Sequence, residues 1–138
     1  MTLYDRYMNG ETESVYVDIE RMGKTAFSPD NFADIEKVLK ETFERVAFNL
    51  DIIHKELVAI DYLFKSHFEY NFQRPLHNPL PDTEKLLTTL DKSMKRFGFI
   101  PQSLKMFYRI VGGCNFAWDY DTNEDYLELC RPNTNHKP

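Results

Sequence analysis

The chain has 138 residues, a formal net charge of −5 and a hydrophobic fraction of 42%. This length suits a single domain, residues 1–138, and the acidic balance disfavours non-specific binding to nucleic-acid phosphates. No apolar run approaches the roughly 20 residues that span a bilayer, and the first ten residues lack the basic flank and apolar centre of a signal peptide. We therefore expect a cytoplasmic protein that binds neither nucleic acid nor membrane.

The N-terminal part predicts two short helices, over residues 3–8 and 11–22. Asn9 and Gly10 separate them, and Gly23 is placed to end the second, because glycine readily adopts the conformation that follows a helix. Val15, Ile19 and Met22 form the apolar edge of the second helix.

Residues 29–65 carry the strongest helical pattern in the chain. Their apolar side chains recur at steps of three or four residues, so they share one face of a helix, and we expect the rest of the chain to pack on that face. Ser28, Pro29 and Asp30 form a strong start signal. The sequence allows one bent helix or two, and the steady spacing favours one with a bend at most near residues 47–51. The apolar stripe comprises Phe32, Ile35, Leu39, Phe43, Val46, Leu50, Ile53, Leu57, Ile60 and Phe64.

The prolines of residues 66–82 exclude regular helix there and predict an ordered crossover loop. A helix is expected over residues 84–97, ended by Gly98, and a last short helix starts at Pro101. We expect both helices to turn their apolar side chains inward. These are Leu86, Leu87, Leu90, Met94 and Phe97 in the first, and Leu104, Phe107, Tyr108 and Val111 in the second.

Two short strands are predicted near the C-terminus, over residues 114–118 and 126–130, joined by a turn-rich acidic segment. Helices and strands are thus segregated along the chain. The predicted fold class is α+β, predominantly helical with a small C-terminal antiparallel β-hairpin.

The segment from Asp119 to Asp125 places oxygen-bearing side chains at alternate positions, as a calcium-binding loop does. The match fails at the sixth position, where Glu124 replaces the required glycine, and at the twelfth, where Cys130 replaces a bidentate glutamate. We therefore expect no metal here and interpret the segment as a contact surface, because aromatic residues anchor interfaces while acids attract a basic partner. The predicted partner-binding residues are Trp118, Asp119, Tyr120, Asp121, Asp125 and Glu128. Alternatively, Trp118 fills the core beneath the hairpin.

No catalytic or cofactor motif is present in the sequence. It contains no GxSxG, GxxxxGK[ST] or GxGxxG pattern, and its four histidines have no metal-ligand spacing. Cys114 and Cys130 are too few for a secreted disulfide framework, so reduced thiols are expected, although the two could face each other across the hairpin. The sequence predicts no enzyme, no cofactor and no metal. A small hydrolase or transferase using His67 and His77 is the alternative.

The basic residues between positions 85 and 109 form a block, because only Asp91 opposes them within that segment. They are Lys85, Lys92, Lys95, Arg96, Lys105 and Arg109. The block lacks a nucleic-acid recognition motif, and we interpret it as solvated helix faces.

Residues 98–116 resemble the SUKH superfamily, which includes bacterial toxin-immunity proteins and yeast proteins linked to killer-toxin resistance. The matching residues are Ile100-Pro101, Leu104, Phe107-Tyr108 and Val111-Gly112-Gly113, followed by a strand. The resemblance implies a helix that leads through a glycine turn into a sheet, and a non-enzymatic immunity or adaptor protein that binds a protein partner. Family members usually continue through several further strands, whereas this chain has room for one hairpin before its polar tail.

The most consistent interpretation is therefore a macromolecule-binding protein that neutralises a basic toxin. A different class is a helical self-association module, in which part of the stripe from Phe32 to Phe64 is buried between two subunits of a homodimer.

Reversing the charges of Asp121 and Asp125, as D121K/D125K, should weaken capture of a basic partner without lowering the melting temperature. The physical reason is that exposed acids attract a basic partner but contribute little to folding. Affinity measurements on both proteins check this, and an unchanged affinity would remove the acidic segment from consideration as the contact surface.

Overall fold

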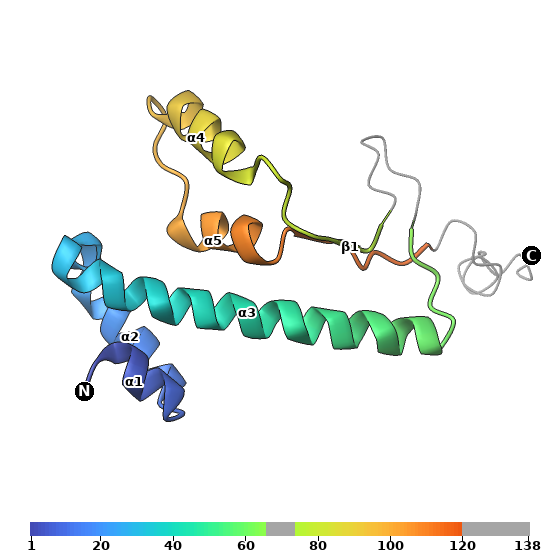
Figure 1. The fold of residues 1–138 in the computed structure, drawn as a ribbon, viewed down its shortest axis with the longest axis horizontal. Helices are drawn as coiled ribbons and strands as arrows, with labels where there is room; N and C mark the ends of the chain where they lie inside the picture. Colours follow the sequence, from blue (N-terminus) through green and yellow to red (C-terminus); the bar gives the residue numbers. More distant parts are fainter. Residues whose placement is uncertain (66–73, 120–138) are drawn as a thin grey trace, which may run out of the picture.

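The computed structural model describes residues 1–65 and 74–119. It confirms a predominantly helical α+β fold with a small two-stranded antiparallel sheet (Figure 1). In chain order the elements are α1 (Leu3–Met8), α2 (Thr12–Met22), the 3₁₀ helix η1 (Gly23–Phe27), α3 (Pro29–Ala59), β1 (Leu76–His77), α4 (Thr83–Met94), α5 (Gln102–Ile110) and β2 (Gly113–Cys114).

Helix α3 is one uninterrupted helix of 31 residues, about 46 Å long, and Figure 1 shows it as a straight rod. Ser28 is its N-cap and Pro29 its first helical residue, as the sequence predicts. The helix ends at Ala59, however, and not at Lys65. Asp61 adopts a positive φ of 56°, and the amide of Tyr62 donates to the carbonyl of Leu57, so the chain turns out of the helix before the last residue of the predicted stripe.

The N-terminal helices pack on one side of α3 and form the best-buried core among the described residues. Val15 of α2 and Val38 of α3 are fully buried, and Tyr7 of α1 is 3% exposed. The Tyr7 ring meets the ring of Tyr16 edge to face, with 6.2 Å between centroids. Apolar contact among three helices therefore fixes α1 and α2 on α3.

Polar contacts complete this packing at both ends of the interface. The side chain of Asp34 accepts a hydrogen bond of 2.7 Å from the backbone amide of Leu3, so a carboxylate of α3 caps the start of α1. The hydroxyl groups of Tyr16 and Thr42 lie 2.5 Å apart, and the Arg45 guanidinium lies 4.9 Å from the Tyr7 ring centroid.

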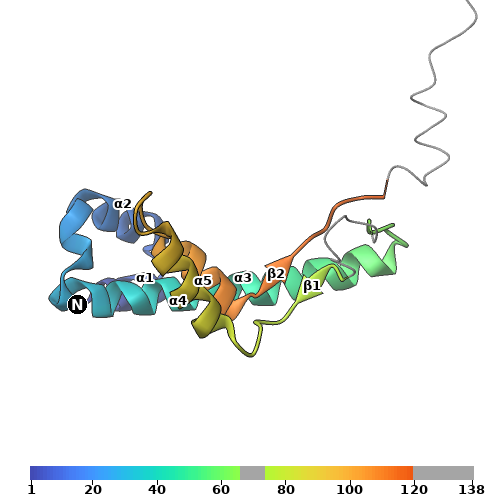
Figure 2. The same ribbon diagram turned by 90° about the horizontal axis from the view of Figure 1, so that it is seen from above.

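Helix α5 packs on the opposite side of α3, and α4 packs on α5 (Figure 1). The ring of Phe107 meets that of Phe43 edge to face at 6.2 Å, and Met106 is 8% exposed. Leu87 is the buried side chain of α4. Seen from above, the α4–α5 pair and then the sheet follow one another along α3 (Figure 2).

The small sheet joins the segment before α4 to the segment after α5. Leu76 pairs with Cys114 and His77 with Gly113, antiparallel. One strand thus comes from the segment predicted as a crossover loop, and the predicted hairpin strand at residues 126–130 lies outside the described residues. Further along, Trp118 forms an isolated bridge with Phe64.

The expectation that the whole α3 stripe is covered is wrong for its C-terminal part. Ile53 is 45% exposed and Ile60 is 71% exposed. The reason is length, because α5 has nine residues, about 14 Å, and α1 only six. Neither reaches the end of α3.

Truncating Val38 and Val58 to alanine should separate the covered part of α3 from the exposed part. V38A removes two methyl groups from a fully buried position and should lower the free energy of unfolding by about 1–3 kcal/mol. V58A, at a position that is 55% exposed, should change it by less than about 0.5 kcal/mol. Urea denaturation measures both, and equal losses would contradict this placement of the core.

Candidate functional site

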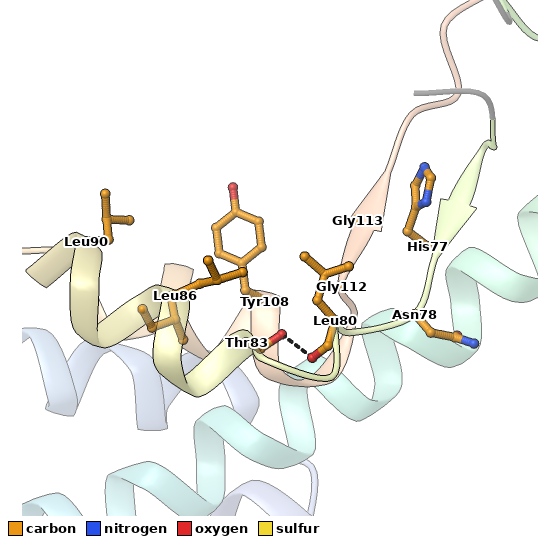
Figure 3. Close-up of a pocket in the computed structure, with 10 residues that line it drawn as sticks. His77, Asn78, Leu80, Thr83, Leu86, Leu90, Tyr108, Gly112 and Gly113 are labelled. Atoms are coloured by element: carbon orange, nitrogen blue, oxygen red, sulfur yellow. Dashed lines mark hydrogen bonds between the residues drawn. The ribbon is translucent and has the colours of Figure 1, made fainter. Parts of the chain in front are cut away.

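An open apolar cavity of about 300 Å³ lies between α4, α5 and the segment that connects β1 to α4 (Figure 3). We call it the apolar groove. Figure 3 shows that its side chains come from α4, α5 and the β1 segment around one opening. It is lined by His77, Asn78, Leu80, Thr83, Leu86, Leu87, Leu90, Tyr108, Gly112 and Gly113.

Helix α4 forms one wall of the groove because its leucines lie on two neighbouring faces. Leu87 is buried, whereas Leu86 is 46% exposed and Leu90 is 40% exposed. The sequence analysis expected all three to pack inward, and this is wrong for Leu86 and Leu90. A helix that contacts one neighbour buries one narrow stripe, and residues 86 and 90 lie about 60° to 100° away from residue 87 around the helix.

Helix α5 forms the opposite wall in the same way. Met106 and Phe107 pack towards α3, while Leu104 is 40% exposed and Tyr108 is 42% exposed. The prediction that Leu104 and Tyr108 point inward is therefore also wrong. In Figure 3 the side chains of Tyr108, Leu86 and Leu90 point towards the same open side.

Gly112 sets how closely the two segments that meet beside the groove approach each other. Its φ is +87°, and a Cβ atom at this position would overlap the carbonyl of His77 and the backbone of Asn78. Only glycine permits both this conformation and this approach. The helix-to-strand reversal that the sequence predicts at Gly112 thus also brings β1 against the end of α5.

Two ion pairs hold α4 in place against α5. The Arg109 guanidinium donates two hydrogen bonds to the Glu84 carboxylate, at 2.6 and 3.0 Å, and Lys105 Nζ lies 2.6 Å from a carboxylate oxygen of Asp91. The contact with Arg109 lowers the pKa of Glu84, and the contact with Glu84 raises the pKa of Arg109. These pairs fix the spacing between the two walls of the groove.

The chemistry of the groove lining suits apolar contact. None of the lining residues is a carboxylate, a lysine, an arginine or a cysteine. The Thr83 hydroxyl donates to the carbonyl of Leu80 at 2.7 Å, a bond drawn in Figure 3. No three histidine, cysteine or acidic residues gather as a metal site within residues 1–65 and 74–119.

Other reactive residues do not add catalytic chemistry to this lining. His77 lines the groove, and His67 lies outside the described residues, so the predicted His67–His77 site is not brought together in the described part. Cys114 is an exposed free thiol on β2, and desolvation raises its pKa, which keeps it protonated at neutral pH.

The predicted contact surface lies elsewhere, beyond the C-terminal end of α3. Trp118 is 37% exposed and bridges Phe64, and the backbone amide of Asp119 donates to the carbonyl of Leu63 at 2.8 Å. Neither Trp118 nor Asp119 lines the apolar groove. The other predicted contact residues, Tyr120, Asp121, Asp125 and Glu128, lie outside the described residues.

Aromatic rings gather where residues 116–118 meet the end of α3. The His54 and Phe116 rings are stacked with 6.1 Å between their centroids, and Phe64 lies 5.9 Å from Phe116. The Tyr62 hydroxyl donates to the Phe116 carbonyl at 2.8 Å. Trp118 thus follows an ordered aromatic cluster, which fixes its backbone and leaves more than a third of its side chain exposed.

The comparisons with known proteins add no family to this geometry. No protein-family model, curated protein or solved structure matches the chain. In the part of the chain that the structure describes, every helix is too short or too polar to cross a membrane.

Replacing Gly112 with alanine should destabilise the protein by more than the same change at Gly10. Both glycines have a positive φ, but an added Cβ at Gly10 meets no atom within 4 Å. G10A should cost about 1 kcal/mol from backbone strain alone, and G112A at least about 2 kcal/mol more, because backbone atoms must move. Thermal and urea unfolding measure the difference, and equal costs would show that the close approach at Gly112 is absent in solution.

Proposed function

We propose that this chain is a non-enzymatic protein-binding protein that covers its apolar groove with a segment of another polypeptide. One observation carries the proposal: an open cavity of about 300 Å³ is surrounded by exposed Leu80, Leu86, Leu90 and Tyr108. Large apolar side chains gathered around a concave surface are typical of protein-interaction sites, because covering them removes apolar area from water.

The composition of the lining supports binding over catalysis. A catalytic pocket brings titratable groups together around a reacting atom, whereas this groove offers leucine side chains, one tyrosine, one histidine and two uncharged polar residues beside its glycines. Tyrosine is also among the residues that contribute most to protein interfaces.

We extend the proposal to a SUKH-type immunity or adaptor role in the cytoplasm. The local order of elements supports it, since Pro101 precedes α5, Gly112 follows it and β2 comes next. In this role the chain would neutralise a toxin by binding it, with the acidic residues near the C-terminus as the contact for a basic partner.

Self-association through α3 is a second candidate, favoured by the exposed apolar residues on its C-terminal half. Phe48 is 67% exposed and Val58 is 55% exposed. Burial of these residues between two copies would explain why a helix carries them. Light scattering that reports a monomer at high concentration would exclude this candidate.

A peptide-display selection tests the proposed groove directly. Peptides selected on the wild-type protein should lose binding to L86E/L90E, because two carboxylates would then stand in the apolar wall. Both leucines are at least 40% exposed, so the variant should keep its melting temperature.

F48E is the matched control, because it places a carboxylate at an exposed apolar position outside the groove. The selected peptides should bind F48E as they bind the wild type. Peptides that bind L86E/L90E and the wild type equally would contradict the proposed function.

A further inference from the structure

The cations of α4 provide a second observation beside the groove. Lys85, Lys92, Lys95 and Arg96 are all exposed, and none forms an ion pair with any residue among 1–65 and 74–119. The carboxylates of α4, on Glu84 and Asp91, are both paired with cations of α5. The protein as a whole is acidic, so this helix presents a local positive field that its own acids do not cancel.

These cations lie on the face of α4 next to the groove wall. Lys85 directly precedes Leu86, and Lys92 stands seven residues after Lys85, which puts both lysines on one side of the helix. This side is about 100° around the helix from Leu86. Lysine side chains in such a position act on a docked partner through their field over several ångströms, within the screening length of physiological salt.

The spacing of the groove-facing residues indicates what kind of segment fits. Thr83, Leu86 and Leu90 follow one another at steps of three and four, which is the seam that one helix presents to another. The stretch from residue 83 to residue 90 rises about 10 Å, the length that two apolar turns of a partner helix occupy.

We propose that the occupant of the apolar groove is an amphipathic α-helix of a partner protein that carries acidic residues beside its apolar stripe. Its leucine-like side chains cover Leu86, Leu90 and Tyr108, and its carboxylates lie in the field of Lys85 and Lys92. This inference rests on the proposed function, because it names the partner of the same groove. An apolar, leucine-lined wall suits such a helix better than a nucleic acid, whose bases need aromatic platforms.

Three designed helical peptides with one shared leucine register test the proposal. They carry glutamate, glutamine or lysine at the flanking positions, and their dissociation constants are measured by fluorescence anisotropy at about 50 mM and about 300 mM salt. The acidic peptide should bind about tenfold more tightly than the basic one at the lower salt concentration, and this preference should shrink at the higher one.

Charge reversal on α4 provides the matched variants. K85E/K92E should abolish or invert the preference for the acidic peptide. K24E/K37E makes the same change in net charge at two exposed lysines that lie outside the groove, and it should leave the preference in place.

The possible outcomes separate this inference from the proposed function. Equal affinity for the three peptides, lost in L86E/L90E, would overturn the acidic preference and leave the groove as a protein-binding site. Display-selected peptides that bind through Leu86 and Leu90 in an extended conformation would overturn the helix.

Two further measurements identify other occupants. Sedimentation of the chain alone that shows a dimer, lost in L86E/L90E, would assign the groove to a second copy and overturn the inference. A single-stranded oligonucleotide that binds wild type but not K85E/K92E, without any binding of the acidic peptide, would overturn it in favour of nucleic acid. Failure of both the designed and the display-selected peptides would overturn the inference and the proposed function together.

Discussion

The described fold depends on the burial of α3 from two sides. On one side Val38 packs with Tyr7 and Val15, and on the other Phe43 packs against Phe107. These contacts join helices that are far apart in sequence, so the free energy of folding is concentrated around the N-terminal half of α3. The α4–α5 pair, and with it the apolar groove, is held in place because α5 occupies one of these two sides.

Local sequence signals predicted the elements because their causes are local. Apolar side chains at steps of three and four gave α3, Pro29 gave its start, and Gly112 gave the reversal into β2. The end of α3 was missed because the positive φ of Asp61 is not written in a residue type that favours it. The pairing of β1 with β2 was missed because two-residue strands have no readable alternation, and only the fold brings Leu76 to Cys114.

The groove could not be predicted from the apolar pattern, because the pattern does not say which apolar face finds a neighbour. Leu86 and Leu87 are adjacent and chemically identical, yet only Leu87 is buried, since α4 meets a single helix. A usable signal was the spacing of Thr83, Leu86 and Leu90 beside Leu87, which gives α4 more apolar width than one neighbour can cover. The acidic contact surface was predicted from composition, and of its residues the structure describes Trp118 and Asp119.

Residue-resolved hydrogen exchange tests most directly whether the two-sided burial of α3 organises the fold. Amides that are covered by packed side chains exchange only through larger openings, whereas helical amides beneath exposed side chains exchange through local fraying. The slowest amides of α3 should therefore lie within residues 35–46, with faster exchange over residues 52–59. Uniform protection along α3, or the slowest exchange within residues 52–59, would contradict the account.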